Sequence, residues 1–239
     1  MSRLDDLHRF YAVLGRLAVR TGGPRKLGDS HGRQDWPTRG VYFFFEPGEA
    51  RTSSGSGLRV IRVGTHALTA GSRTTLWNRL AQHRGVPSSG GGNHRGSIFR
   101  LLVGEALLAR GLGSCESWGV ASSLGEAARR SGRAREEVEE AERPVEIQVS
   151  RVIREMPLLW VRVDDPPGER SQRGFIERNA IALLSNWEKE PLDPPGASWL
   201  GHRSGRDRVR TSGLWNSHHV DEGYDRAFLG VLEAATEGS

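Results

Sequence analysis

Two short apolar runs separated by a polar segment stand out in the pattern of hydrophobic and polar residues along the chain. The first run is Gly40–Phe45 and the second is Leu58–Thr65, and both are rich in Val, Ile, Phe and Tyr. Such runs are typical of strands, because branched and aromatic side chains pack well on a pleated surface. The segment Arg51–Gly57 between them is mostly Ser and Gly and predicts a flexible connection. Two strands joined by one loop predict an antiparallel hairpin.

Apolar residues at helical spacing predict helices on both sides of this hairpin. An amphipathic helix is expected over about residues 3–21, and a second helix over Thr74–His83 begins with a threonine that can cap it. Ser97 and Ser171 precede two further apolar stripes, so we expect each to cap a helix. Asp221 is expected to cap the last helix of the chain.

The remaining segments complete a small α+β fold. The run Leu158–Val163 predicts a third strand, and the charged stretch Leu124–Glu142 predicts one solvated helix with halves of opposite charge. We therefore expect one domain over residues 1–239, built on a three-stranded antiparallel sheet flanked by helices. A charged helical insertion is expected at about 115–155, and a basic loop followed by a helix at about 190–236.

The composition of the chain indicates which partners and which cell compartment to expect. The formal net charge is +5 and most of the positive residues are Arg, which favours a polyanionic partner. Cys115 is the only cysteine, which excludes an internal disulfide and a cysteine metal cage. The start of the chain lacks the apolar core of a signal peptide, and no stretch has the apolar length of a membrane span. We therefore expect a cytoplasmic protein.

The hairpin and the helix after it carry the candidate chemistry. The first strand begins Gly-Val-Tyr at Gly40–Tyr42, and the second ends Arg-Val-Gly at Arg62–Gly64. Arg79 and His83 follow one helical turn apart on the next helix. This order resembles the GIY-YIG nuclease family, with Val for Ile in the first tripeptide and Arg62 in place of the Tyr of the second. His83 resembles a histidine of the restriction-enzyme branch of that family.

Two later segments extend the resemblance over most of the chain. Glu177 lies on an apolar helical stripe and resembles the metal-binding Glu of the family, and Asn216 resembles the Asn near the end of the same branch. Each has a structural alternative: Glu177 has Arg173 and Arg178 at ion-pair spacing, and an Asn after Trp215 is a common turn former.

The resemblance implies a mechanism for hydrolysing DNA phosphodiester bonds. Tyr42 would be the general base, Arg79 would contact the phosphate, and Glu177 would hold one Mg²⁺ or another divalent cation on the leaving-group side. A tyrosine with an ordinary pKa near 10 is a poor base at neutral pH, and His83 is placed to accept its proton. Asn216 would fix a loop or bind near the site.

Arg62 is the main departure from the family pattern. Arginine keeps its proton and cannot serve as a base, so Arg62 would hold phosphate or stabilise an ionised Tyr42. Two functions follow. The first is a Mg²⁺-dependent endonuclease acting on double-stranded DNA, and the alternative is a non-catalytic nucleic-acid-binding protein that retains a degenerate GIY-YIG fold.

Basic residues outside the motif are candidates for binding nucleic acid. A glycine-rich loop contains His94 and Arg95, which would reach DNA unless the loop is an ordinary surface turn. A second basic segment lies near the C-terminus, with Arg203, Arg206, Arg208 and Arg210. The pair His218–His219 with Asp221 offers metal ligands of the kind found in HNH nucleases, but its spacing matches no zinc pattern.

Overall fold

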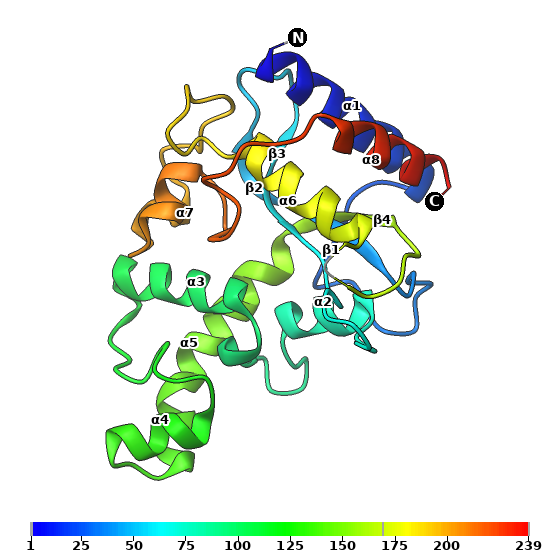
Figure 1. Cartoon of the computed structure of the whole chain (residues 1–239). Coiled ribbons are helices and arrows are strands. Elements are labelled where there is room, and N and C mark those ends of the chain that lie inside the picture. The colour runs from blue at the N-terminus through cyan, green and yellow to red at the C-terminus, as the bar shows by residue number, and fades with distance from the viewer. Residues whose placement is uncertain (1, 169, 239) are drawn as a thin grey trace.

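The computed structural model describes residues 2–168 and 170–238 and is built around one antiparallel sheet (Figure 1). The strand order is β1-β4-β2-β3, and every neighbouring pair is antiparallel. The strands are β1 (Arg25–Lys26), β2 (Gly40–Ala50), β3 (Leu58–Gly64) and β4 (Pro157–Arg162). The predicted α+β class and the three predicted strands are confirmed. Strand β1 was not predicted because two polar residues carry no strand pattern; it forms by pairing with the start of β4.

Helices surround this sheet. They are α1 (Arg3–Thr21), α2 (Leu76–Arg84), η1 (His94–Gly96), α3 (Ile98–Leu107), η2 (Leu108–Leu112), α4 (Leu124–Ser131), α5 (Arg135–Glu155), α6 (Gln172–Leu184), η3 (Leu200–Arg203), α7 (Asp207–Ser212) and α8 (Ala227–Glu237). The side chains of Thr75, Ser97 and Ser171 accept backbone N–H groups at the starts of α2, α3 and α6, as their sequence positions predict. The last helix begins later than predicted, with Asp225 rather than Asp221 accepting from its first N–H.

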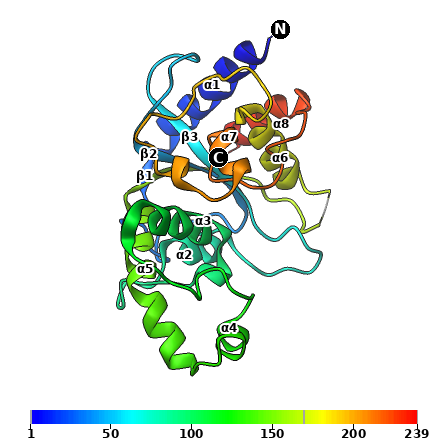
Figure 2. The same cartoon turned by 90° about the vertical axis from the view of Figure 1, so that its left-hand side faces the viewer.

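The two faces of the sheet bury two different cores. Val41 and Phe43 pack on one face with residues of α1, α6 and α8, while Tyr42 and Phe44 pack on the other with residues of α2, α3 and α5. Figures 1 and 2 show these two groups of helices on opposite sides of the sheet. Successive residues of β2 are therefore buried on opposite sides, which explains why Gly40–Phe45 is apolar without alternation. The candidate catalytic residue Tyr42 belongs to the α2 and α3 face.

The charged stretch differs from the prediction of one solvated helix. Gly132 adopts a left-handed conformation at φ 66° and separates α4 from α5. Helix α5 then runs through Pro144 to Glu155, and its side facing α3 buries Glu142 and Glu146. Figure 1 shows α4 and the adjoining end of α5 projecting away from the sheet. The acidic residues of α5 are therefore only partly exposed to solvent.

The Ser- and Gly-rich connection between β2 and β3 is held in place. The Asp193 carboxylate accepts the backbone N–H groups of Thr52, Ser53 and Ser54 at 2.8, 2.7 and 2.9 Å, and also the hydroxyl of Ser54. A charged acceptor takes three adjacent donors, so the sequence expectation of a flexible connection is replaced by an anchored loop.

We predict that Asp193→Ala destabilises the fold by about 3 kcal/mol, because hydrogen bonds to a charged group are lost and a buried N–H is left unpaired. Chemical unfolding in urea measures the change. Asp193→Asn is the matched control, since it retains one acceptor oxygen and should lose less. Equal stability of the alanine variant and the wild type would show that the loop needs no anchor.

Candidate active site

The register of the hairpin places Tyr42 directly opposite Gly64. The two residues are paired across β2 and β3, and a Cβ atom at Gly64 would lie 2.2 Å from the Tyr42 hydroxyl oxygen. Only glycine leaves room for the ring to cross the neighbouring strand. Gly64, which ends the second tripeptide, therefore provides the space in which the Tyr42 ring packs.

The Tyr42 hydroxyl contacts His83 of α2. The Tyr42 oxygen lies 2.8 Å from Nε2 of His83, and Nδ1 of His83 lies 2.7 Å from Oγ of Ser97. Burial lowers the pKa of His83 well below its ordinary value, and the positive charges of Arg79, Arg62 and Arg100 lower it further. His83 is therefore neutral at physiological pH and retains one nitrogen lone pair.

Arg62 lies on the same sheet face and is buried. One of its Nη atoms donates to the carbonyl of Trp215, and the guanidinium lies 4.8 Å from the centre of the Phe99 ring. Its Nε is buried and has no partner among the described residues. Burial lowers the pKa of Arg62, and the nearby Tyr42 and Glu177 oppose that shift. A cation is therefore held close to both groups.

Glu177 reaches the same region from α6. Its Oε1 accepts the backbone N–H of Thr65 at 3.0 Å, directly after the end of β3. The carboxylate also lines a surface pocket of about 570 Å³ with His219 and Arg178. Burial raises the pKa of Glu177, while Arg62, the Thr65 N–H, His219 and Arg79 oppose the increase. The side chain thus belongs to the cluster of Tyr42 and the arginines.

Arg79 and Asn216 complete the set predicted from the sequence. Arg79 is half-buried and donates to Oε1 of Gln82 at 3.0 Å and to the carbonyl of Gly96 at 3.1 Å. The Asn216 side chain accepts the N–H of Val63 at 3.1 Å and donates to its carbonyl at 2.9 Å. This amide pairs with β3 as another strand would, and so fixes the segment around Asn216 beside the site.

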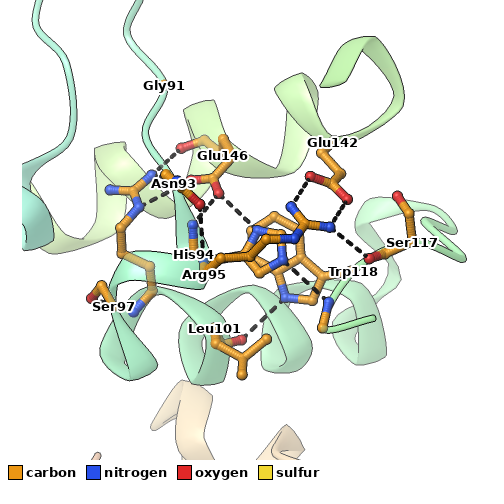
Figure 3. A network of polar contacts seen from close by, with 12 residues as sticks. Gly91, Asn93, His94, Arg95, Ser97, Leu101, Ser117, Trp118, Glu142 and Glu146 are labelled. Atoms are coloured by element: carbon orange, nitrogen blue, oxygen red, sulfur yellow. Dashed lines mark hydrogen bonds and ion pairs between the residues drawn. The ribbon is translucent and has the colours of Figure 1, made fainter. Parts of the chain in front are cut away.

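The structure places the two residues of the glycine-rich loop inside the protein. His94 is buried, with its ring stacked on Trp118 at a centroid distance of 3.9 Å, and Arg95 forms two contacts with Glu142 at 2.6 and 2.7 Å (Figure 3). Nδ1 of His94 lies 2.9 Å from Glu146, and its Nε2 accepts a backbone N–H from Gly119. Their polar groups are used internally, so neither side chain is available to bind DNA phosphate.

The C-terminal arginines lie on the surface, and three of them are paired. Arg206 forms two contacts with Glu105 at 2.9 and 2.8 Å, while Arg208 pairs with Asp221 and Arg210 with Asp207. Arg203 is exposed and has no charged partner among the described residues. Exposed ion pairs of this kind contribute little to stability and exchange readily with another anion.

The acid groups of the site fit a hydrated metal ion better than a closed cage. Within residues 2–168 and 170–238, no group of three or more His, Cys, Asp or Glu side chains could hold an ion. The segment with His218, His219 and Asp221 thus forms no such group, and Nδ1 of His219 lies 2.9 Å from Glu222. A single carboxylate such as Glu177 is sufficient for Mg²⁺, which keeps most of its water ligands.

Sequence reasoning missed the contact of Ser97 with His83 and that of the Thr65 backbone with Glu177. Ser97 was recognised only as a helix cap, which it is, since its Oγ accepts the N–H of Arg100 at 3.2 Å. The contacts of Ser97 with His83 and of Thr65 with Glu177 join residues far apart in the chain, and no spacing rule predicts them.

A tyrosine beside a neutral histidine, with two arginines and one carboxylate in the same region, supplies groups of the types that phosphodiester cleavage requires. Here these groups lie on an antiparallel hairpin and the helices around it. A comparison with protein-family models matches residues 1–239 to the GIY-YIG domain, and the chain belongs to that family. Family membership implies nuclease activity and a nucleic-acid substrate.

The other comparisons add no relative. Searches of curated proteins and of solved structures gave no match to the chain. Among the helices that the structure describes, none has the length and apolar character needed to cross a membrane.

We predict that Gly64→Ala destabilises the protein by at least about 2 kcal/mol and displaces the Tyr42 ring, because the added methyl group overlaps it. Gly230→Ala is the control, since a Cβ at Gly230 in α8 meets no atom within 4 Å and alanine favours a helix. Thermal unfolding and tyrosine side-chain NMR compare the two variants. An unchanged Tyr42 environment in Gly64→Ala would contradict the close approach.

Proposed function

We propose that this protein is a Mg²⁺-dependent endonuclease that hydrolyses phosphodiester bonds in double-stranded DNA. One observation carries the proposal: the hydroxyl of Tyr42 lies 2.8 Å from Nε2 of a neutral His83, on the sheet face that also buries Arg62. Arg79 lies one turn before His83 on α2, and Glu177 accepts the N–H of Thr65 just after the end of β3. These groups supply a proton acceptor, positive charge and a metal ligand, which are the requirements of phosphodiester hydrolysis.

Tyr42 and His83 act together as the general base. When Nε2 of His83 accepts the Tyr42 hydrogen, the lone pairs of the tyrosine oxygen are directed away from the histidine and toward the attacking water. As the water oxygen bonds to phosphorus, its proton passes to the Tyr42 oxygen and the Tyr42 proton passes to His83. The hydroxyl of Tyr42 is regenerated in the same step.

Arg62 and Arg79 stabilise the negative charge that develops on the phosphate. In the free protein their charges oppose protonation of His83. A bound phosphate offsets those charges, so His83 becomes a better proton acceptor when substrate is present. The donors of Arg62 also include the buried Nε that has no partner among the described residues.

Glu177 is the proposed metal ligand. Its Oε1 is fixed by the Thr65 N–H, and the carboxylate lines an open pocket where a hydrated ion fits. When bound, Mg²⁺ supplies the Lewis acid that favours departure of the 3′-oxygen. Asn216 contributes indirectly, by fixing its segment against β3.

The proposed DNA-binding surface consists of the C-terminal arginines rather than the glycine-rich loop. Their carboxylate partners are exposed enough for phosphate to compete with them, and Arg203 has no such partner among the described residues. Arg208 also donates to the carbonyl of Ser217, next to Asn216, and this contact supports a DNA-binding surface near the candidate site.

A non-catalytic nucleic-acid-binding protein is the second candidate, and one observation favours it. Tyr42, His83 and Arg62 are 1%, 0% and 5% exposed, so water and phosphate must displace part of the protein to reach the hydroxyl. Arg62 in place of a second tyrosine is consistent with the same view. Cleavage assays on plasmid DNA, with Mg²⁺ or with a chelator, distinguish the two functions.

We predict that Glu177→Gln abolishes cleavage but leaves DNA affinity nearly unchanged, because the amide keeps the shape and loses the charge that holds Mg²⁺. Binding is measured at increasing salt, where counterion release should weaken it steeply. Glu222→Gln is the control, since Glu222 contacts Arg178 and His219 near the same pocket without the proposed ligand role.

The same variant tests the electrostatics of Glu177. Its pKa is raised in the fold, so the ionised carboxylate destabilises the protein at neutral pH, and stability rises as pH falls through that pKa. Glu177→Gln should therefore have a higher melting temperature without metal, and Mg²⁺ should raise the melting temperature of the wild type only. Full cleavage by Glu177→Gln would remove Glu177 from the site.

We predict that Tyr42→Phe folds normally and cleaves at least about a hundredfold more slowly, because only the hydroxyl is removed. Tyr11→Phe is the matched control: Tyr11 is also buried and its hydroxyl oxygen accepts the N–H of Val60, but it lies in the opposite core. The kcat of each variant on one duplex is compared. Wild-type cleavage by Tyr42→Phe would exclude Tyr42 as the base.

A further inference from the structure

The two ring nitrogens of His83 face two different hydroxyls. Nε2 lies 2.8 Å from the Tyr42 oxygen and Nδ1 lies 2.7 Å from the Ser97 oxygen. A neutral imidazole has one N–H and one lone pair, so it can accept from only one of these hydroxyls. If Nδ1 carries the hydrogen, His83 accepts from Tyr42; if Nε2 carries it, the Tyr42 proton has no acceptor there.

The surroundings of Tyr42 favour the first arrangement. The hydroxyl is buried, and Nε2 of His83 lies within hydrogen-bond distance of it. The cation of Arg62 lies near the oxygen and therefore favours a hydrogen that points away from it, toward His83. A phenol is also a stronger proton donor than the alcohol of a serine. Tyr42 thus occupies the Nε2 lone pair, and Nδ1–H donates to Ser97.

Ser97 is a well-anchored acceptor for that N–H. It precedes α3 and its Oγ accepts the backbone N–H of Arg100 at 3.2 Å, which leaves a second lone pair for His83. The first turn of α3 therefore sets where the oxygen lies. The cap and the histidine contact are two functions of one hydroxyl.

Arg100 fixes the backbone of His83 from the same turn of α3. Its Nη1 donates to the His83 carbonyl at 2.9 Å, and its Nε donates to Glu146 of α5 at 3.0 Å. Burial opposes ionisation of Glu146, but hydrogen bonds from His94 and the charge of Arg100 outweigh it and lower the pKa of Glu146. Figure 3 shows Ser97 and Glu146 among the residues around these contacts, which join α3 to α5.

We propose that Ser97 is a positioning residue for cleavage, which holds His83 with hydrogen on Nδ1 so that Nε2 receives the Tyr42 proton. The inference rests on the proposed nuclease function. In the reaction, the water proton moves to Tyr42, the Tyr42 proton moves to Nε2, and the resulting imidazolium keeps its Nδ1–H bond to Ser97. After cleavage the added proton returns to solvent.

The chain contains a matched control for the loss of the cap. Ser123 caps α4, and its Oγ accepts the N–H of Glu126 at 3.2 Å, the same distance as at Ser97, but it lies far from His83. Ser123→Ala measures the loss of a helix cap alone, and Ser97→Ala should lower the melting temperature further, because it also leaves Nδ1 of the buried His83 without its partner. We expect kcat to fall about 10- to 100-fold in Ser97→Ala alone, with KM changed less than about twofold.

Two other substitutions separate the hydroxyl from the cap. Ser97→Gly removes the hydroxyl but retains a residue favoured at helix starts, so it serves if the alanine variant does not fold. It should lose as much kcat as Ser97→Ala. Ser97→Thr keeps the hydroxyl and should restore kcat to within about threefold of the wild type. Equal kcat in Ser97→Ala, Ser97→Gly and Ser123→Ala would overturn the proposal.

The tautomer of His83 gives a readout that does not depend on activity. Imidazole ¹⁵N chemical shifts of the free protein should show hydrogen on Nδ1 in the wild type and a mixture of tautomers in Ser97→Gly. Hydrogen on Nε2 in the wild type would overturn the proposal. A wild type that cleaves no DNA but shows the Nδ1 tautomer would refute the nuclease function while confirming the orientation of His83.

Discussion

The hydrogen bond between the Tyr42 hydroxyl and Nε2 of His83 is the interaction on which the site depends. It forms because Gly64 lets the tyrosine ring cross β3 and because α2 packs its inner side against the same sheet face. The bond pairs two buried polar groups, the Tyr42 hydroxyl and Nε2 of His83, so it contributes to folding; its part in catalysis belongs to the proposed function. Helices α3 and α5 then support the histidine from behind through Ser97 and Arg100.

The balance of buried charge defines what the site can do. Arg62 and Arg100 bring cations into an interior that also holds His83, and the same burial raises the pKa of Glu177. The free protein thus holds an excess of positive charge around a neutral histidine. Under the proposed function, a bound phosphate would offset this charge and make the arrangement more favourable.

Much of the fold followed from local patterns. Strand composition, apolar residues at helical spacing and cap residues were enough to predict three strands and the starts of α2, α3 and α6. The boundary inside the charged stretch was missed because the Arg and Glu around Gly132 suit one continuous helix, and the glycine, which ends α4 in a left-handed conformation, was not taken as a helix end. The anchored loop between β2 and β3 was also missed, since its acceptor, Asp193, lies about 140 residues away.

The sequence by itself determined the order of the hairpin, the helix of Arg79 and the helix of Glu177, because strand and helix patterns and the spacing of the motif are local properties. Only the tertiary structure decided which side chains meet and which are buried. It brings Ser97 to His83 and the Thr65 N–H to Glu177, and it buries Arg95 against Glu142. The physical reason is that an arginine or a serine forms whichever contact the packed chain brings within reach, and composition does not encode that distance.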